Sequence, residues 1–228
     1  MKNPKVSFII DKKLDIENHL IGMYSYKDKL HARTNKNERY EKLLKLTPKQ
    51  RIDFIQKEIS CFYSNKNKAK LEEIRDETQK YWNKIEKEFF KRIEKTFNKP
   101  FPFNSIKGIL STANRFGYNY KNKWFATNIH SNKFSATDIA MHELFHFIFH
   151  FYFEKECKKH ELTWKQIWDI KEALTVLLNS EFLDLRLTLD KGYPEHQKTR
   201  SFILKEWKKN KDFNIVLNNT CKFVKKNY

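Results

Sequence analysis

The scarcity of helix-breaking residues constrains this chain more than any other feature of its sequence. Only 4 glycines and 5 prolines occur among 228 residues, so few positions favour the tight turns that a many-stranded β fold requires. The long segments between them carry Leu, Ile, Phe, Lys and Glu, which is a helix-forming composition. The sequence therefore predicts a mainly α fold with a small β component, in the α+β class.

Hydrophobic periodicity changes character near residue 100. Before that point we expect a strand at Val6–Ile10 and then helices, the longest over residues 67–97 with apolar positions every three or four residues. After it we expect two strands, Ile106–Thr112 and Trp124–Ile129, followed by helices. The remaining expected helices are 14–23, 35–46, one capped by Thr47-Pro48, one from Ser135–Asp138 to about Cys157, 164–183, 194–209 and 213–224.

The net charge of +18 is spread along the chain. Residues 1–100 carry 25 basic and 15 acidic side chains, and residues 101–228 carry 21 and 13. No arginine-rich block or basic tail concentrates this charge, which argues against a dedicated nucleic-acid surface. Residues 101–137 contain no acidic side chain but several basic ones, Arg115 among them. An acidic substrate or a C-terminal carboxylate would suit that stretch, although a solvated surface is the simpler explanation.

The cysteines and the apolar segments indicate the cellular compartment of the protein. Cys61, Cys157 and Cys221 are odd in number and far apart, so they predict neither a disulfide framework nor a structural zinc site. The first apolar run, Val6–Ile10, is too short for the core of a signal peptide. No apolar stretch approaches the ~20 residues of a membrane span. We expect a soluble cytoplasmic protein without membrane contact, and its oligomeric state stays open.

The pattern His142-Glu143-Leu144-Phe145-His146 carries the chemistry of this sequence. On a helix, residues four apart project from one face, so both imidazoles can reach a single metal ion. Zinc accepts neutral imidazole nitrogens, and a catalytic zinc site uses three protein ligands and a water. Glu143 lies beside that face, where it can take a proton from the water. The alternative is a buried aromatic-rich helix that contains two histidines by chance.

Two candidates for a third ligand are poor. The metzincin class requires glycine and histidine where this chain has Phe149 and Tyr152, so that class is excluded. His150 lies one further helical turn on, roughly 6 Å along the axis from His146, and is therefore expected to be a core histidine or a support for a ligand.

The length of the next helix selects a better candidate. A helix that starts near Trp164 and runs back toward His146 needs roughly nine to eleven residues to reach its level. Glu172 lies at that distance, within an otherwise apolar run. Asp169, one turn earlier, could orient a ligand imidazole. Asp138 is the other carboxylate near the motif, with a role as helix N-cap at least as plausible.

These residues resemble the gluzincins, zinc metallopeptidases with HExxH on one helix and a glutamate ligand on the next. The matching residues are His142, Glu143, His146 and Glu172, within roughly residues 105–185. The resemblance implies one zinc ion per chain, a water nucleophile, peptide-bond hydrolysis and a substrate lying along an edge strand such as Trp124–Ile129. Many gluzincins carry an aspartate four residues after the ligand glutamate, where this chain has Val176.

The change in hydrophobic periodicity near residue 100 suggests a division into two regions. Residues 101–228 would form the zincin-like core and residues 1–100 a mostly helical region, or both would belong to one compact unit. Peptide hydrolysis also needs a donor for the oxyanion, and His196 and then Tyr193 are the candidates, because both follow a turn that leads into a helix.

The sequence thus predicts a zinc-dependent metallopeptidase that acts on a peptide or protein substrate. A first alternative is a regulatory or binding protein that keeps the zincin core with little general proteolytic activity. A second alternative, a basic nucleic-acid-associated protein, depends on charge alone and would require a steep salt dependence of binding.

Overall fold

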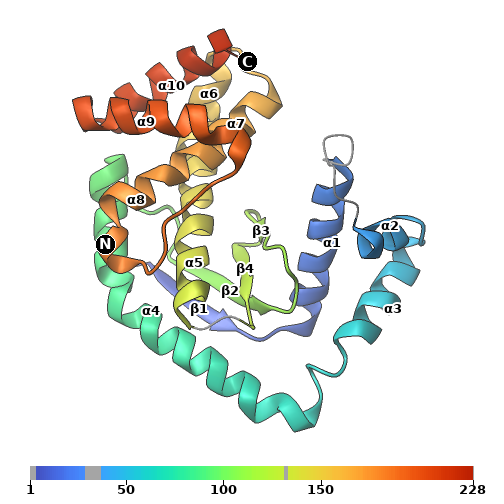
Figure 1. Cartoon of the computed structure of the whole chain (residues 1–228). Helices are drawn as coiled ribbons and strands as arrows, with labels where there is room; N and C mark the ends of the chain where they lie inside the picture. Colours follow the sequence, from blue (N-terminus) through green and yellow to red (C-terminus); the bar gives the residue numbers. More distant parts are fainter. Residues whose placement is uncertain (1–3, 29–36, 131–132, 228) are drawn as a thin grey trace.

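The computed structural model describes residues 4–28, 37–130 and 133–227, in which a four-stranded sheet lies among helices (Figure 1). The strands are β1 (Lys5–Ile9), β2 (Ser105–Ser111), β3 (Tyr118–Asn119) and β4 (Trp124–Asn128). Their order across the sheet is β1-β2-β4-β3. Strands β1, β2 and β4 are mutually parallel, whereas β3 is antiparallel to β4. The expected mainly α fold with a small sheet is confirmed.

The position of β4 corrects one expectation. Residues 124–128 pair with β2 on one side and with β3 on the other, so β4 lies inside the sheet. The prediction that Trp124–Ile129 is an edge strand is therefore wrong. The chain between β2 and β4 folds back and forms β3, and this short segment, Tyr118–Asn119, becomes the edge of the sheet.

A glycine in the middle of the sheet allows two aromatic rings to meet. Gly108 on β2 is the partner of Phe8 on β1 and of Phe125 on β4. A Cβ atom at Gly108 would stand 2.8 Å from the Phe8 ring and 3.0 Å from the Phe125 ring, too close for any other residue. The two rings contact each other edge to face, with centroids 6.2 Å apart. They contribute to the face of the sheet that packs in the main core.

Two long helices cover that face of the sheet. α4 (Lys68–Phe97) contacts β1, and α5 (Lys133–Ile148) contacts β4 and α4. α4 agrees closely with the helix expected over residues 67–97. Its side chains also bond to the outer edge of β1: Gln79 accepts from the Phe8 N–H and donates to the Val6 carbonyl, while Glu86 accepts from the Val6 N–H. This edge of the sheet is therefore closed.

The helix that carries the HExxH motif begins earlier than expected, and further helical turns follow it without a break. α5 starts at Lys133, so Ser135–Asp138 lie inside the helix and the predicted N-cap there is wrong. The Asp138 carboxylate instead accepts hydrogen bonds from the N–H and hydroxyl of Thr188. A π-helical turn over Phe149–Phe153 leads directly into α6 (Glu154–Lys159), close to the expected end near Cys157.

The chain then turns back over α5 and completes the fold with helices. Thr163 caps α7 (Trp164–Leu174) through a capping box with Gln166, which fixes where the returning helix starts. The helix expected over residues 164–183 is interrupted after Leu174 by a 3₁₀ turn, whereas the helices expected over 194–209 and 213–224 are each present as one helix. The remaining elements are α8 (Leu178–Glu181), α9 (Gln197–Asn210) and α10 (Phe213–Asn227), with 3₁₀ turns before α8 and α9.

Three N-terminal helices form an arm on the opposite side from these C-terminal helices (Figure 1). They are α1 (Lys12–Asp28), α2 (Glu38–Leu44) and α3 (Pro48–Ile59). The expected N-cap at Thr47 is present, and Gln50 completes a capping box with it. The first residues of the helix expected over 35–46 lie outside the described residues. The arm has its own small core, made of Met23, Tyr40, Leu43, Ile55 and Ile59.

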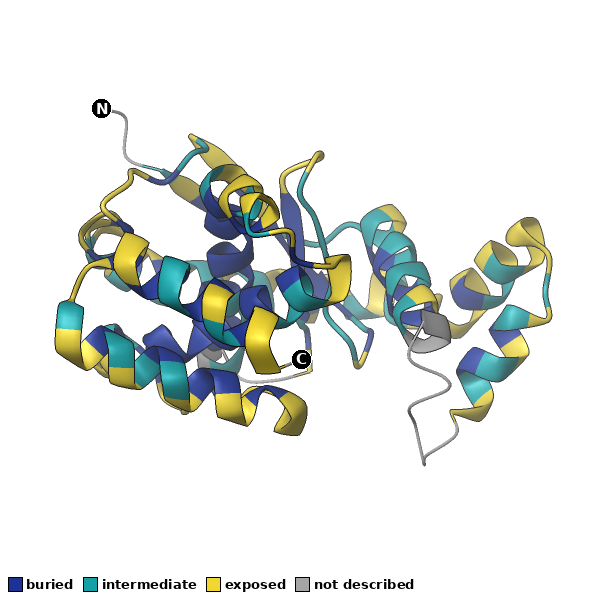
Figure 2. Cartoon of the chain, turned by 90° about the horizontal axis from the view of Figure 1, so that it is seen from above, coloured by how far each residue is buried: buried dark blue, intermediate teal, exposed yellow. Residues whose placement is uncertain are grey.

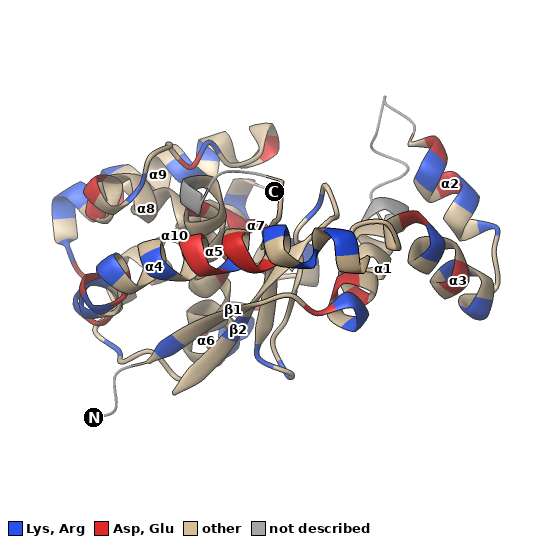
Figure 3. Cartoon of the chain, turned by 90° about the horizontal axis from the view of Figure 1, so that it is seen from below, with Lys and Arg blue, Asp and Glu red and all other residues tan. Residues whose placement is uncertain are grey.

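The main core joins both halves of the sequence. Val6, Phe8 and Phe89 precede residue 100, and they pack with Phe125 and Leu144, which follow it. Figure 2 shows buried positions gathered around the sheet and the C-terminal helices, with fewer in the arm. Lys and Arg are scattered over several helices, with acidic residues among them (Figure 3). Among the described residues, no helix combines the length and apolarity needed to cross a membrane.

Candidate metal centre

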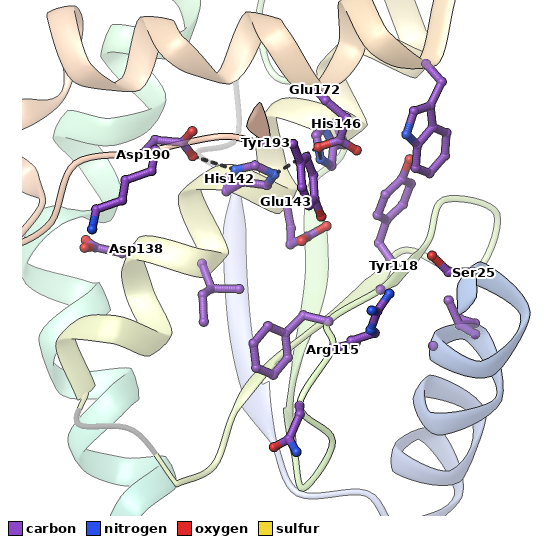
Figure 4. A pocket seen from close by; sticks show the side chains of 18 of the residues that line it. Ser25, Arg115, Tyr118, Asp138, His142, Glu143, His146, Glu172, Asp190 and Tyr193 are labelled. Atoms are coloured by element: carbon purple, nitrogen blue, oxygen red, sulfur yellow. Dashed lines mark hydrogen bonds and ion pairs between the residues drawn. The ribbon is translucent and has the colours of Figure 1, made fainter. Parts of the chain in front are cut away.

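The structure brings His142, His146 and Glu172 to one point. The two histidines project from α5 and the glutamate from α7, and one ligand atom of each lies within 4.8 Å of the others. The Nε2 atoms of both imidazoles are 3.6 Å from the Glu172 Oε2 atom. Zinc-ligand bonds are about 2.0–2.2 Å long, so three donors at this spacing can surround one ion. Figure 4 shows the three side chains converging.

Glu143 lies beside these ligands without joining them. Its side chain is buried, and its Oε2 atom has no hydrogen-bond partner within the described part of the chain. Burial raises the pKa of this carboxyl to about 7, with the charges of Glu172 and Asp190 adding to the effect against those of His142 and Lys171. A buried carboxylate oxygen without a partner is costly unless a ligand or water supplies one.

Asp190 holds the first histidine in place. Its Oδ2 atom accepts a hydrogen bond from Nδ1 of His142 at 2.6 Å, which leaves Nε2 directed toward Glu172. The carboxylate is itself fixed by Arg200 at 2.9 Å and by the Thr175 hydroxyl at 3.1 Å. Although burial opposes ionisation, the His142 hydrogen bond and the Arg200 charge hold the pKa of Asp190 at about 2. A carboxylate bonded to a ligand imidazole sets its tautomer and its orientation.

The far side of Glu172 carries a buried lysine. Lys171 Nζ lies 2.8 Å from Glu172 Oε1 and 3.0 Å from the Tyr118 hydroxyl, and it sits 3.7 Å from the centre of the Trp168 ring. Burial alone would raise the pKa of Glu172, but the charge of Lys171 and the hydrogen bond from His142 are among the effects that outweigh it, and they hold that pKa well below its usual value. One oxygen of Glu172 is therefore engaged by Lys171, and the other faces the histidines.

The second histidine has the properties of a neutral ligand. His146 is buried, and burial together with the charge of Lys171 lowers its pKa well below the usual value. Its Nδ1 atom lacks a hydrogen-bond partner among the residues that the structure describes. Neutral imidazole is the form that coordinates zinc. Two imidazoles, one carboxylate and an unpartnered carboxylate at Glu143 fit a zinc ion at this point.

Three other residues singled out from the sequence have different places. His150 Nε2 shares a 2.7 Å hydrogen bond with the Tyr118 hydroxyl, and its Nδ1 lies 2.6 Å from Glu154. Because Tyr118 contacts Lys171, which binds Glu172, His150 supports a ligand indirectly, which is one of its two expected roles. Asp138 fastens the loop at Thr188. Asp169 lies 3.1 Å from His196, so its carboxylate does not orient a metal-facing imidazole; Asp190 does this.

The two candidate oxyanion donors are separated by the structure. Tyr193 lines the same cleft as the metal-facing residues, and Figure 4 shows it at their level. Burial and the charges of Glu172 and Glu143 raise the pKa of its hydroxyl, which keeps it a proton donor at neutral pH. His196 is buried, bonds to Asp169 and is not among the residues that line this cleft.

The candidate metal centre opens into a cleft of about 860 Å³. α5, α7 and the loop over residues 186–193 form the side that bears His142, Glu143 and Glu172, while α1 and the segment before β3 form the opposite side. Tyr118 on the edge strand also lines it. The site thus has room for a substrate much larger than a water molecule.

Comparisons with models of protein families, with curated protein sequences and with solved structures gave no match for this chain. The interpretation of the site therefore depends on its own geometry and on the chemistry of its residues.

Sequence reasoning missed the groups that hold the ligands. Asp190 lies 48 residues after His142 in a polar turn, where no periodic pattern marks it. Tyr118 lies 53 residues before Lys171. Lys171 itself carried a signal, because a lysine next to Glu172 in an apolar helical run needs a buried partner.

Proposed function

We propose that this protein is a zinc-dependent metallopeptidase. One observation carries the proposal: both imidazole Nε2 atoms of the HExxH helix face the same oxygen of Glu172 at 3.6 Å, with the Glu143 carboxylate beside them in an open cleft. Two imidazoles, one carboxylate and an accessible fourth side constitute the donor set of a catalytic zinc site. The proposal also accords with the gluzincin resemblance of the same four residues.

Glu143 would act as the general base. A bound zinc ion would lower the pKa of a coordinated water and polarise the substrate carbonyl. Glu143 would accept the proton of the attacking water and then deliver it to the leaving nitrogen. The burial that raises the pKa of Glu143 to about 7 suits a group that must both accept and donate a proton near neutral pH.

Tyr193 and β3 would contribute to the handling of the substrate. Tyr193 is the better placed of the two candidate donors, because it lines the cleft and His196 does not. Its hydroxyl would donate to the oxygen on which negative charge develops. An extended peptide would lie along β3 rather than β4, since β3 forms the edge of the sheet and its Tyr118 lines the cleft. We place the activity in the cytoplasm, where a reducing environment would keep Cys157 and Cys221, whose sulfur atoms lie 3.6 Å apart, as free thiols.

Metal analysis tests the first half of this proposal. The purified wild-type protein should contain about one zinc ion per chain, as a single three-ligand site requires. Glu172→Ala should lose most of that zinc, because it removes one ligand and leaves the two imidazoles. Full zinc content in this variant would remove Glu172 from the ligand set. Glu156→Ala, which removes an exposed carboxylate of α6, is the matched control and should retain zinc.

Peptide cleavage tests the second half. Glu143→Gln should retain zinc but lose cleavage of a peptide library by at least about 100-fold, since general base catalysis is worth that much. Mass spectrometry of the library before and after incubation identifies the products. Undiminished cleavage by Glu143→Gln would exclude Glu143 as the base. A wild-type protein with stoichiometric zinc and no cleavage would favour a regulatory or binding role instead.

A further inference from the structure

An arginine stands in the wall of the cleft that faces the metal centre. Arg115 lies between α1 and the edge strand, and Figure 4 shows it on the opposite side of the cleft from His142 and Glu172. Its backbone carbonyl accepts a 3.0 Å hydrogen bond from the Asn18 side chain, and its guanidinium lies 5.9 Å from the centre of the Tyr40 ring. The backbone of this arginine is therefore fixed, and the residue as a whole is half-buried.

The guanidinium has no carboxylate partner within the described residues. The acidic groups that line the cleft are engaged elsewhere: Glu172 with Lys171, Asp190 with His142 and Arg200, and Asp138 with Thr188. Glu143 is buried beside the ligands. Arg115 therefore presents its donors to the cleft and its solvent, and a guanidinium offers five of them in a planar fork that matches a carboxylate.

The other cationic side chains that line the cleft are either already hydrogen-bonded or lie on the same side as the metal centre. Lys171 is bonded to Glu172, and Arg186 donates to the carbonyl oxygens of Asp138 and Thr188. Lys191 is exposed on the loop that carries Asp190, on the same side as the metal centre. The charge of Arg115 reaches across the cleft to Tyr193. It opposes the rise in the pKa of the Tyr193 hydroxyl that burial and the charge of Glu172 cause.

We propose that Arg115 binds a carboxylate of the substrate, so that the cleft selects peptides that carry a negative charge at a set distance from the cleaved bond. The inference rests on the proposed peptidase function and names its substrate class. A carboxylate near Glu143, Glu172 and Asp190 would be repelled by their charges, whereas at Arg115 it would be paired. Binding there would hold the chain in one register across the metal centre. The carboxylate can belong to the peptide C-terminus or to an acidic side chain.

Peptide binding to a non-cleaving protein tests this inference. The background is Glu143→Gln, loaded with zinc, and the probes are four hexapeptides with a fluorescent label at the N-terminus. They share one neutral sequence and differ in two respects: glutamate or glutamine at one position, and a free or amidated C-terminus. Fluorescence anisotropy measures each dissociation constant. The substitutions at Arg115 are Arg115→Gln, which replaces the guanidinium with a shorter neutral amide, and Arg115→Lys, which keeps the charge.

Peptides with a carboxylate should bind more tightly than the neutral peptide. Arg115→Gln should weaken the charged peptides by at least about tenfold and leave the neutral one unchanged, because a bidentate charge-assisted pair is lost. Arg115→Lys should retain part of the preference, and Lys191→Ala, the control cation of the same cleft, should retain all of it. Loss of preference on amidation identifies the C-terminal carboxylate, and loss on glutamine substitution identifies the side chain.

Two results would overturn the inference in different ways. Equal binding of all four peptides, or an equal loss for all of them in Arg115→Gln, would show that Arg115 only shapes the cleft wall while the peptidase proposal stands. Binding of none of the four peptides to the zinc-loaded protein would overturn this inference, while cleavage of the peptide library would still decide the peptidase proposal.

Discussion

At the scale of single residues, the candidate metal centre consists of ligands held by partners. Asp190 orients His142 through Nδ1, and Lys171 takes one oxygen of Glu172 while the other faces the two imidazoles. A metal ion gains most from ligands that are already in position, because little conformational entropy is then lost on binding. The precision of this site therefore depends on residues that would never touch the metal.

Replacing Asp190 should weaken zinc binding without removing a ligand. Asp190→Asn loses the charge that stabilises the His142 Nδ1–H and the pair with Arg200, so zinc affinity should fall by roughly 10- to 100-fold. Competition with a chromophoric chelator measures the dissociation constant. Asp169→Asn is the control, since Asp169 bonds to His196 and Lys165 and should leave the affinity unchanged. Equal affinities of wild-type protein and Asp190→Asn would show that His142 orients itself.

At the scale of elements, side chains of α4 form the hydrogen bonds along the outer edge of β1 that a neighbouring strand would otherwise form. Gln79 and Glu86 bond to the outward N–H groups of Val6 and Phe8 and to the Val6 carbonyl, which would otherwise be an exposed sheet edge. Glu86 also accepts from the Trp82 indole and from Lys5. The covered edge of β1 leaves β3 as the edge that lies at the cleft.

Glu86 should therefore matter to stability far more than the exposed glutamates of α4. Glu86→Ala leaves the buried Val6 N–H and the Trp82 indole N–H without their acceptor, so the free energy of unfolding should fall by about 2–4 kcal/mol. Urea unfolding followed by circular dichroism provides the measurement. The exposed Glu94 on the same helix is the control, and Glu94→Ala should change stability by less than about 0.5 kcal/mol. Similar losses in both variants would contradict this role of Glu86.

At the scale of the whole molecule, the cleft exists because the N-terminal arm, α1 to α3, is attached to the sheet opposite the metal centre. Asp15 on α1 is fully buried and accepts hydrogen bonds from Ser111, from the N–H and hydroxyl of Thr112, and from the Tyr63 hydroxyl beyond α3. One carboxylate thus joins α1, the end of β2 and the end of the arm. The same α1 carries the wall that positions Arg115 through Asn18.

Loss of this junction should loosen the arm and spare the metal centre. Asp15→Asn places an amide donor among groups that all donate, so stability should fall by about 1–3 kcal/mol and proteolysis should begin in the arm. Zinc content should stay near one ion per chain, because the three ligands lie on α5 and α7. Asp53→Asn, an exposed position on α3, is the control. Loss of zinc in Asp15→Asn would show that the arm and the metal centre form one cooperative unit.

The local part of this protein could be predicted from its sequence. Helical spacing places His142 and His146 on one face, the breaker pattern predicts the helices, and the rise per residue brings Glu172 back to the level of His146. These inferences succeed because they depend on the geometry of single helices, which the local sequence determines.

Only the tertiary structure decided the rest. Asp190 at His142, Tyr118 at Lys171 and the inner position of β4 all depend on contacts between segments far apart in the chain. Such contacts follow from how helices and strands pack around a shared core, and no periodic pattern records them. The sequence by itself determined which residues can face a metal ion, whereas packing decided what holds them, which strand borders the cleft and which charge stands across from it.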